Sequence, residues 1–90
     1  MSREELATAS DLLESAAGET DDEASSERLT ELAGQLETLA ERDRGPDHGR
    51  LARIENALGE LRESAGTAAV DDIDEAHEQI KAYRSGVEGV

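Results

Sequence analysis

Apolar residues recur at alternating intervals of three and four along four successive stretches of the chain. This spacing places their side chains on one face of an α-helix, so we expect helices over residues 2–17, 22–42, 47–65 and 69–85. The two middle stretches carry most of the large apolar side chains: Leu29, Leu32, Leu36 and Leu39, then Leu51, Ile54, Leu58 and Leu61. We expect these eight residues to form a helix-packing interface.

Turn and capping residues separate the four stretches. Gly45-Pro46 stops the second helix, and Asp47 is a candidate N-cap for the third. Gly18 and Gly66 follow the first and third stretches and predict helix ends there. No stretch shows the alternating pattern of a strand. The sequence therefore predicts an all-α fold in a single domain of residues 1–90: a small antiparallel bundle built on a helical hairpin of the second and third helices.

Composition alone would point away from a folded domain. Only 16 of the 90 residues are Leu, Ile or Val, which is below the roughly 20% at which a highly charged chain tends to be disordered. We nevertheless expect a folded protein, because a shuffled chain would rarely place so few aliphatic side chains so regularly. The core is small for a monomer, so we expect a homodimer or another protein partner.

The chain is strongly acidic, with 23 Asp and Glu against nine Lys and Arg and a net charge of -14. Such a surface repels phosphate backbones and anionic lipids, so we expect neither nucleic acid nor a membrane as partner. No apolar run is long enough for a membrane span or a secretory signal. We therefore expect a cytoplasmic protein adapted to concentrated salt, which screens the repulsion between acidic groups.

Positive charge gathers in residues 42–53, which hold four of the eight arginines. This stretch is also the predicted turn into the third helix. A cation is unfavourable at a helix N-terminus unless an acid or a bound anion lies nearby. The candidate site for an anion or a partner comprises Arg44, Asp47, His48, Arg50 and Arg53. The simpler alternative is that these arginines pair with acids of neighbouring helices.

Groups that support catalysis or metal binding are sparse. The chain has no cysteine, which excludes disulfides and thiolate metal sites. His48 lies beside Asp47, and His77 could share a helical surface with Asp74 and Glu78, but neither cluster forms a known metal motif. No serine lies in a nucleophile-elbow context, and no Walker-type loop is present. We expect no catalytic activity and no cofactor.

Several short segments carry a resemblance to a known family. They are Gly45-Pro46-Asp47-His48-Gly49-Arg50-Leu51-Ala52-Arg53, Asn56-Ala57-Leu58, Ile73-Asp74-Glu75-Ala76, and Tyr83-Arg84 with Val87-Glu88-Gly89-Val90. In these segments the chain resembles an uncharacterised family of small acidic helical proteins from halophilic archaea, most strongly from about Leu29 onward. The resemblance implies a cytoplasmic, salt-adapted helical protein and transfers no catalytic residue.

Two functions follow from these observations. The sequence favours a non-enzymatic structural or protein–protein interaction module, which would use its apolar helix faces to bind itself or a partner. The alternative is a protein that senses a small anion or a nucleotide phosphate through Arg44, His48, Arg50 and Arg53 in the arginine-rich turn.

Overall fold

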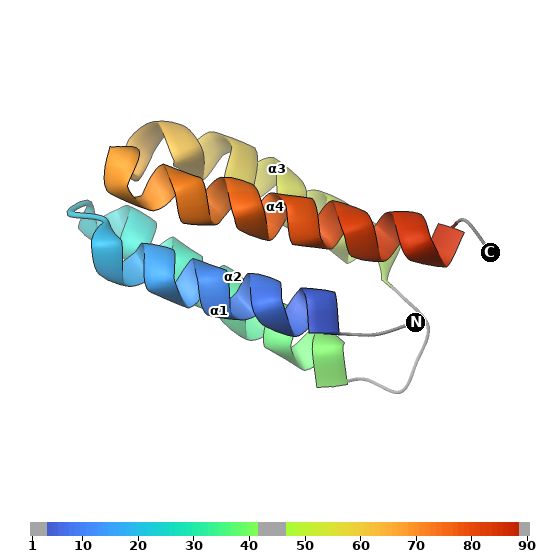
Figure 1. Cartoon of the computed structure of the whole chain (residues 1–90). Coiled ribbons are helices and arrows are strands. Elements are labelled where there is room, and N and C mark those ends of the chain that lie inside the picture. Colours follow the sequence, from blue (N-terminus) through green and yellow to red (C-terminus); the bar gives the residue numbers. More distant parts are fainter. Residues whose placement is uncertain (1–3, 42–46, 89–90) are drawn as a thin grey trace.

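A computed structural model describes residues 4–41 and 47–88, and within these ranges the chain forms four α-helices and no strand (Figure 1). The helices are α1 (Glu4–Glu19), α2 (Glu23–Glu41), α3 (His48–Ser64) and α4 (Thr67–Glu88). Consecutive helices run in opposite directions (Figure 1). The predicted all-α class and antiparallel bundle are confirmed. None of these four helices is long and apolar enough to cross a membrane.

Local sequence signals set both ends of α3. Asp47 is its N-cap, because Oδ1 accepts a hydrogen bond from the backbone N–H of Arg50 at 3.0 Å. Gly66 follows the helix with a φ of +92°, in the left-handed region that favours glycine. Both residues therefore act as the sequence predicts.

Two other helix ends differ from the prediction. Gly18 lies inside α1, which continues to Glu19, so the predicted end at this glycine is wrong. α4 begins at Thr67 and extends to Glu88, and is therefore longer at both ends than the predicted 69–85. The expected start of the first helix at residue 2 lies outside the described residues.

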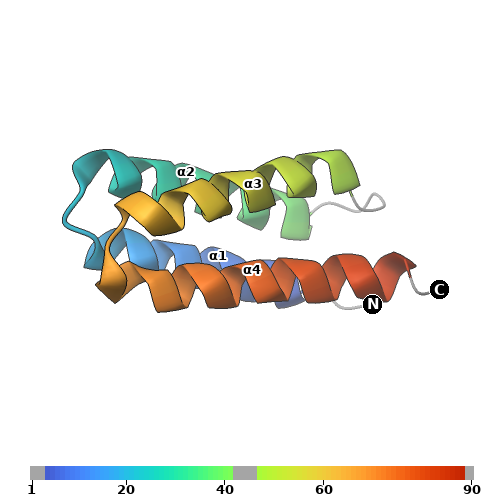
Figure 2. The ribbon, with the colours of Figure 1, turned by 90° about the horizontal axis from the view of Figure 1, so that it is seen from above.

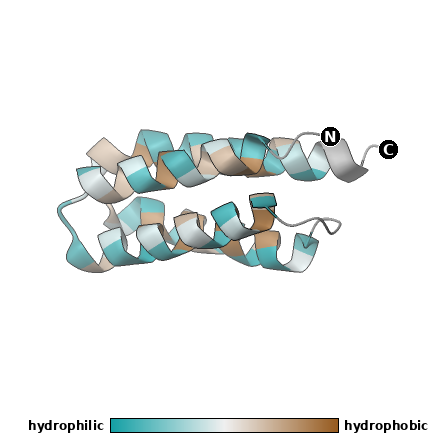
Figure 3. Ribbon diagram, turned by 90° about the horizontal axis from the view of Figure 1, so that it is seen from below, coloured by the Kyte–Doolittle hydropathy of each residue, from teal (hydrophilic) through white to brown (hydrophobic). Residues whose placement is uncertain are grey.

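The residues of the predicted helix-packing interface lie in the core of the bundle. All eight residues of the predicted interface are buried, and none of them is more than 9% exposed. They join apolar residues of α1 and α4, such as Leu13 and Ile80, in one cluster. Hydrophobic positions recur between hydrophilic ones along the helices (Figure 3). The single chain thus covers, within itself, the faces that its sequence assigns to helix packing.

The helices do not approach one another equally. α1 packs closely against α2 and α4, whereas α3 packs mainly on α4 and approaches α2 least (Figures 1 and 2). Buried alanines, Ala9 and Ala16 on α1 and Ala69 and Ala76 on α4, accompany the close pairs. The buried residues of α3 are three leucines and an isoleucine. Because the side chains at a contact set the distance between helix axes, larger side chains keep α2 and α3 apart.

The pair of consecutive helices that packs most closely is therefore not the predicted pair. The sequence predicts that the second and third helices form the hairpin on which the bundle is built. The structure instead has a close α1–α2 hairpin facing an α3–α4 hairpin (Figure 1). The contact between α2 and α3 is the loosest in the bundle, and we call it the open seam.

Candidate functional site

The predicted site residues divide between the two sides of α3. Asp47 precedes the helix, and His48, Arg50 and Arg53 lie in its first two turns. Arg44, which the sequence also assigns to the site, lies outside the described residues. Arg50 faces the open seam together with Arg53, whereas His48 contacts α4. The structure thus brings part of the predicted site together and separates the rest.

A hollow of about 180 Å³ lies on the open seam, and we call it the arginine pocket. Three arginines, one glutamine and two apolar residues line it: Arg28, Leu32 and Gln35 from α2, and Arg50, Arg53 and Ile54 from α3. Arg28 is the member that sequence reasoning missed. It lies 22 residues before Arg50 in the chain, so only the packing of α2 beside α3 could reveal it.

Few acidic side chains pair with the guanidinium groups of the pocket. Nη1 of Arg28 donates to Oε1 of Glu31 at 2.7 Å, and Nε of Arg50 lies 3.7 Å from Oδ2 of Asp47. Arg53 has no ion pair within the described part of the chain. Since each guanidinium carries five N–H donors, most of the donors around the pocket stay available to a ligand or to water.

The remaining lining residues give the pocket an apolar base. Leu32 and Ile54 belong to the core, and each is only 1% exposed. Gln35 is half-buried and adds an amide that can donate or accept a hydrogen bond. Guanidinium groups above an apolar base suit an oxyanion, because their paired N–H donors match the spacing of carboxylate, sulfate or phosphate oxygens.

A second polar cluster joins α3 to α4 around Arg84. The Nε–H of Arg84 donates to Nδ1 of His48 at 3.2 Å, and Nη1 donates to Oε1 of Glu55, also at 3.2 Å. Nε2 of His77 lies 3.7 Å from the same Glu55 oxygen. The side chain of Glu55 is 18% exposed, and its Oε2 is buried with no hydrogen-bond partner within residues 4–41 and 47–88. We call these four residues the Arg84 cluster.

The Arg84 cluster gives His77 a neighbour on α3 that the sequence does not suggest. The sequence suggests that His77 could share a surface with Asp74 and Glu78. In the structure Asp74 binds Arg62, which is the main cause of the lowered pKa of that carboxyl, and His77 is near enough to Asp74 to contribute to the lowering. His77 also faces Glu55 on α3. Sequence spacing gave no signal for this, because many acids lie at helical intervals from each histidine. No group of His, Asp and Glu in the described residues is arranged to hold a metal ion.

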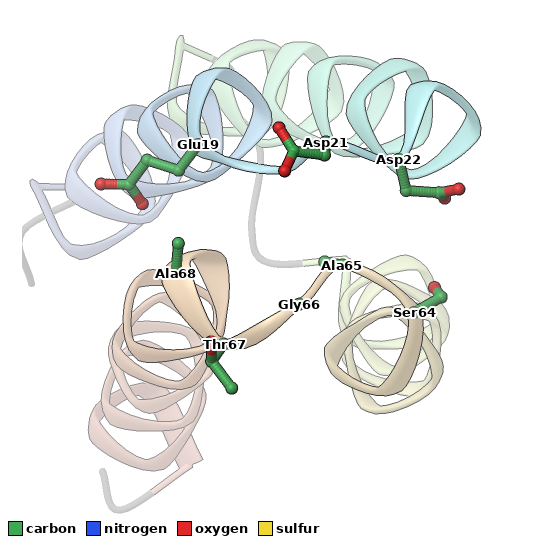
Figure 4. Close-up of a pocket in the computed structure, with 8 residues that line it drawn as sticks. All are labelled: Glu19, Asp21, Asp22, Ser64, Ala65, Gly66, Thr67 and Ala68. Atoms are coloured by element: carbon green, nitrogen blue, oxygen red, sulfur yellow. The ribbon is translucent and has the colours of Figure 1, made fainter.

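A hollow larger than the arginine pocket, about 470 Å³, lies at the end of the bundle where the α1–α2 and α3–α4 connections face one another (Figure 4). Glu19, Asp21 and Asp22 line one side of it, and residues 64–68 line the other. A hydrogen bond with Asp72, on α4, raises the pKa of Glu19. Since no cation lines this hollow, it is a poor site for an anion.

Asp22 has a structural role at the edge of this hollow. Its carboxylate accepts hydrogen bonds from the backbone N–H and the hydroxyl of Ser25, which lower the pKa of Asp22. Ser25 also contacts the hydroxyl of Ser64 at 3.1 Å, across the open seam. Asp22 therefore holds the start of α2 through its Oδ2 atom.

Comparison with known proteins places the chain in a family. Residues 1–86 match the model of a family of unknown function, DUF7553. No curated protein and no solved structure is similar enough to count as a match. The match agrees with the resemblance to an uncharacterised family, whereas the expected source in halophilic archaea stays a prediction.

Proposed function

The chain belongs to the DUF7553 family, whose function is unknown, and we propose that it is a non-enzymatic protein that binds small oxyanions in the arginine pocket. The single observation that carries this proposal is the convergence of Arg28, Arg50 and Arg53 from two helices on one hollow. The rest of the molecule is dominated by acids and repels anions, so an anion-binding site must be local and arginine-rich.

The size of the pocket favours a small ligand. Sites for drug-sized molecules usually enclose about 300–1,000 Å³, and the arginine pocket encloses about 180 Å³. A free sulfate, a phosphate or a short carboxylate fits that volume. A nucleotide could place only its phosphate there, with the nucleoside outside. We therefore favour the small anion over the nucleotide phosphate that the sequence left open.

The lining of the pocket supports binding rather than catalysis. Arginine stays protonated in proteins and cannot act as a general base near neutral pH. Gln35, Leu32 and Ile54 supply neither a nucleophile nor a titratable group. The proposed role is accordingly recognition of the anion, with no bond made or broken.

Sulfate binding tests this function directly. Isothermal titration calorimetry would use the lowest KCl concentration at which circular dichroism shows full helicity, because chloride competes for arginines. Arg53→Ala should weaken sulfate binding by about tenfold or more, since a hydrogen bond to a charged group contributes about 1.5–3 kcal/mol. Parallel titrations with phosphate, acetate and a nucleoside monophosphate would identify the preferred anion.

Lys81→Ala is the matched control, because it removes one positive charge from an exposed position on α4 that pairs only weakly with Glu78, at 3.5 Å. We expect this variant to bind sulfate within about twofold of the wild type, as a screened surface charge contributes little. Equal losses in Arg53→Ala and Lys81→Ala would contradict a specific pocket, and so would a wild type that binds none of the anions.

The structural or protein-interaction role that the sequence favours, and the homodimer that goes with it, remain predictions. The eight apolar residues assigned to such contacts are buried inside the chain, so a second copy or a protein partner would have to use the outer, largely acidic faces. Light scattering in concentrated KCl would measure the oligomeric state. A cytoplasmic location likewise remains a prediction.

A further inference from the structure

The helix that supplies two of the pocket arginines is held at its start by the Arg84 cluster. His48 is the first residue of α3, and Glu55 lies two turns further along. Arg84, on α4, bonds to both of them. Arg50 and Arg53 lie between these two attachment points in the chain. Arg84 therefore helps to hold the turns of α3 that carry the two pocket arginines.

The bond between Arg84 and His48 requires an unprotonated nitrogen. Nε of Arg84 always carries hydrogen, so Nδ1 of His48 must accept with its lone pair. Once Nδ1 binds a proton it can no longer accept, and the imidazolium then repels the guanidinium. Histidine is the side chain whose ordinary range of titration falls between about pH 5 and 8.

The second histidine acts on the other bond of Arg84. His77 and Arg84 both face Oε1 of Glu55, at 3.7 and 3.2 Å. A protonated His77 would be a second cation beside that oxygen and would repel the guanidinium of Arg84. Protonation of His48 and of His77, the only two histidines of the chain, would thus weaken both bonds of Arg84.

We propose that the Arg84 cluster is a pH-sensitive clamp that holds the anion site in its binding form near neutral pH and releases it in acid. This inference rests on the proposed anion-binding function and adds its regulation. In the described ranges, the titratable groups bonded to Arg84 are His48 and Glu55 from α3. His77 on α4 faces the same Glu55 oxygen and also interacts with Asp74 on its own helix. Among the described residues, no group of α1 or α2 forms an ion pair with Arg84.

Sulfate is the appropriate ligand for the test, because its charge stays constant over the range in which histidine titrates. Calorimetry would compare its binding at about pH 8 and about pH 5.5, near the upper and lower ends of the ordinary histidine range. If acid reduces the binding-competent fraction to about one tenth, the apparent Kd rises about tenfold. We expect this rise in the wild type, with circular dichroism showing that the helices persist at both pH values.

His48→Asn is the matched variant, because the amide oxygen of asparagine can accept from Arg84 at every pH. It should bind sulfate like the wild type near pH 8 and keep most of that affinity in acid. A wild-type measurement guards against a variant that does not fold: the ¹⁵N resonance of Arg84 Nε should lose its hydrogen-bonded shift in acid.

Each outcome has a distinct meaning. No sulfate binding at about pH 8, the upper side of the histidine range, removes the anion-binding function. Binding of equal or greater strength in acid removes the clamp and leaves the function standing. The clamp is equally excluded if His48→Asn follows the wild-type pH dependence, or if the Arg84 Nε resonance does not move.

Discussion

Arg62 and Asp74 are joined by two hydrogen bonds, from Nε to Oδ1 at 2.7 Å and from Nη2 to Oδ2 at 2.9 Å. This pair ties α3 to α4 near their connection, and the Arg84 cluster ties the same two helices near the start of α3. The open seam has only the contact between the hydroxyls of Ser25 and Ser64 as a polar link among the described residues. Within residues 4–41 and 47–88, α3 is therefore tied to α4 by charged side chains and to α2 by that one hydroxyl contact.

The Arg62–Asp74 pair should make folding sensitive to acid. The hydrogen bond from Arg62 is the main cause that lowers the pKa of Asp74. The stabilisation is therefore complete above the ordinary aspartate pKa of about 3.9 and is lost as the pH falls through the lower folded value. Asp74→Asn should lower the thermal unfolding midpoint near pH 7 and flatten its decline in acid. Thermal melts followed by circular dichroism across the pH range measure both effects.

Asp11→Asn provides the control for this experiment. Asp11 is an exposed acid on α1 whose side chain forms no hydrogen bond or ion pair among the described residues. Its replacement removes one negative charge without breaking an interhelical contact, so the midpoint near neutral pH should change little. An equal loss of stability in the two variants would show that the Arg62–Asp74 geometry does not matter.

The close approach of α1 and α2 should be intolerant of added volume at Ser10. Ser10 is buried, and its hydroxyl donates to the backbone carbonyl of Ala33 at 2.8 Å. Ser10→Ala should cost only about 1 kcal/mol, the usual contribution of one hydrogen bond. Ser10→Leu should cost about 1–3 kcal/mol or more through overpacking. Urea unfolding gives both free energies, and a leucine variant as stable as the alanine variant would contradict the close packing.

Replacement by alanine should change the free energy of unfolding in opposite directions at two glycines. Gly66 has a φ of +92°, where an L-residue is strained, although the space around it is open. Gly66→Ala should therefore cost about 1–2 kcal/mol. Gly59 lies within α3 with no atom near enough to clash with an added methyl group, so Gly59→Ala should stabilise by about 0.5–1 kcal/mol. Urea unfolding of the two variants checks the signs, and a shared sign would contradict these backbone assignments.

Low salt should destabilise the bundle through repulsion between acids. Helix α1 carries five acidic residues and no basic residue, and α3 balances three arginines with three glutamates. Lowering the ionic strength from about 1 M to about 0.1 M lengthens the Debye length from about 3 to 10 Å. We expect helicity measured by circular dichroism to fall over this range. Unchanged helicity would remove the argument for salt adaptation.

The sequence by itself determined the four helices and the residues that they bury. The spacing of leucines and isoleucines is a local property, and each helix has one face that can be hidden from water. The cap at Asp47 and the left-handed Gly66 are local for the same reason. The predicted helix end at Gly18 was wrong because glycine permits a helix end without requiring one.

Only the tertiary structure decided which helices pair and which distant charges meet. The place of α1 between α2 and α4 follows from how small and large side chains fit across each contact, and a stripe along one helix does not specify its partner. Arg28 joins Arg50 and Arg53, His48 meets Arg84, and His77 meets Glu55, because the bundle brings these helix faces together. In a chain with 23 acids and eight arginines, spacing offers many equivalent ion pairs, and packing selects among them.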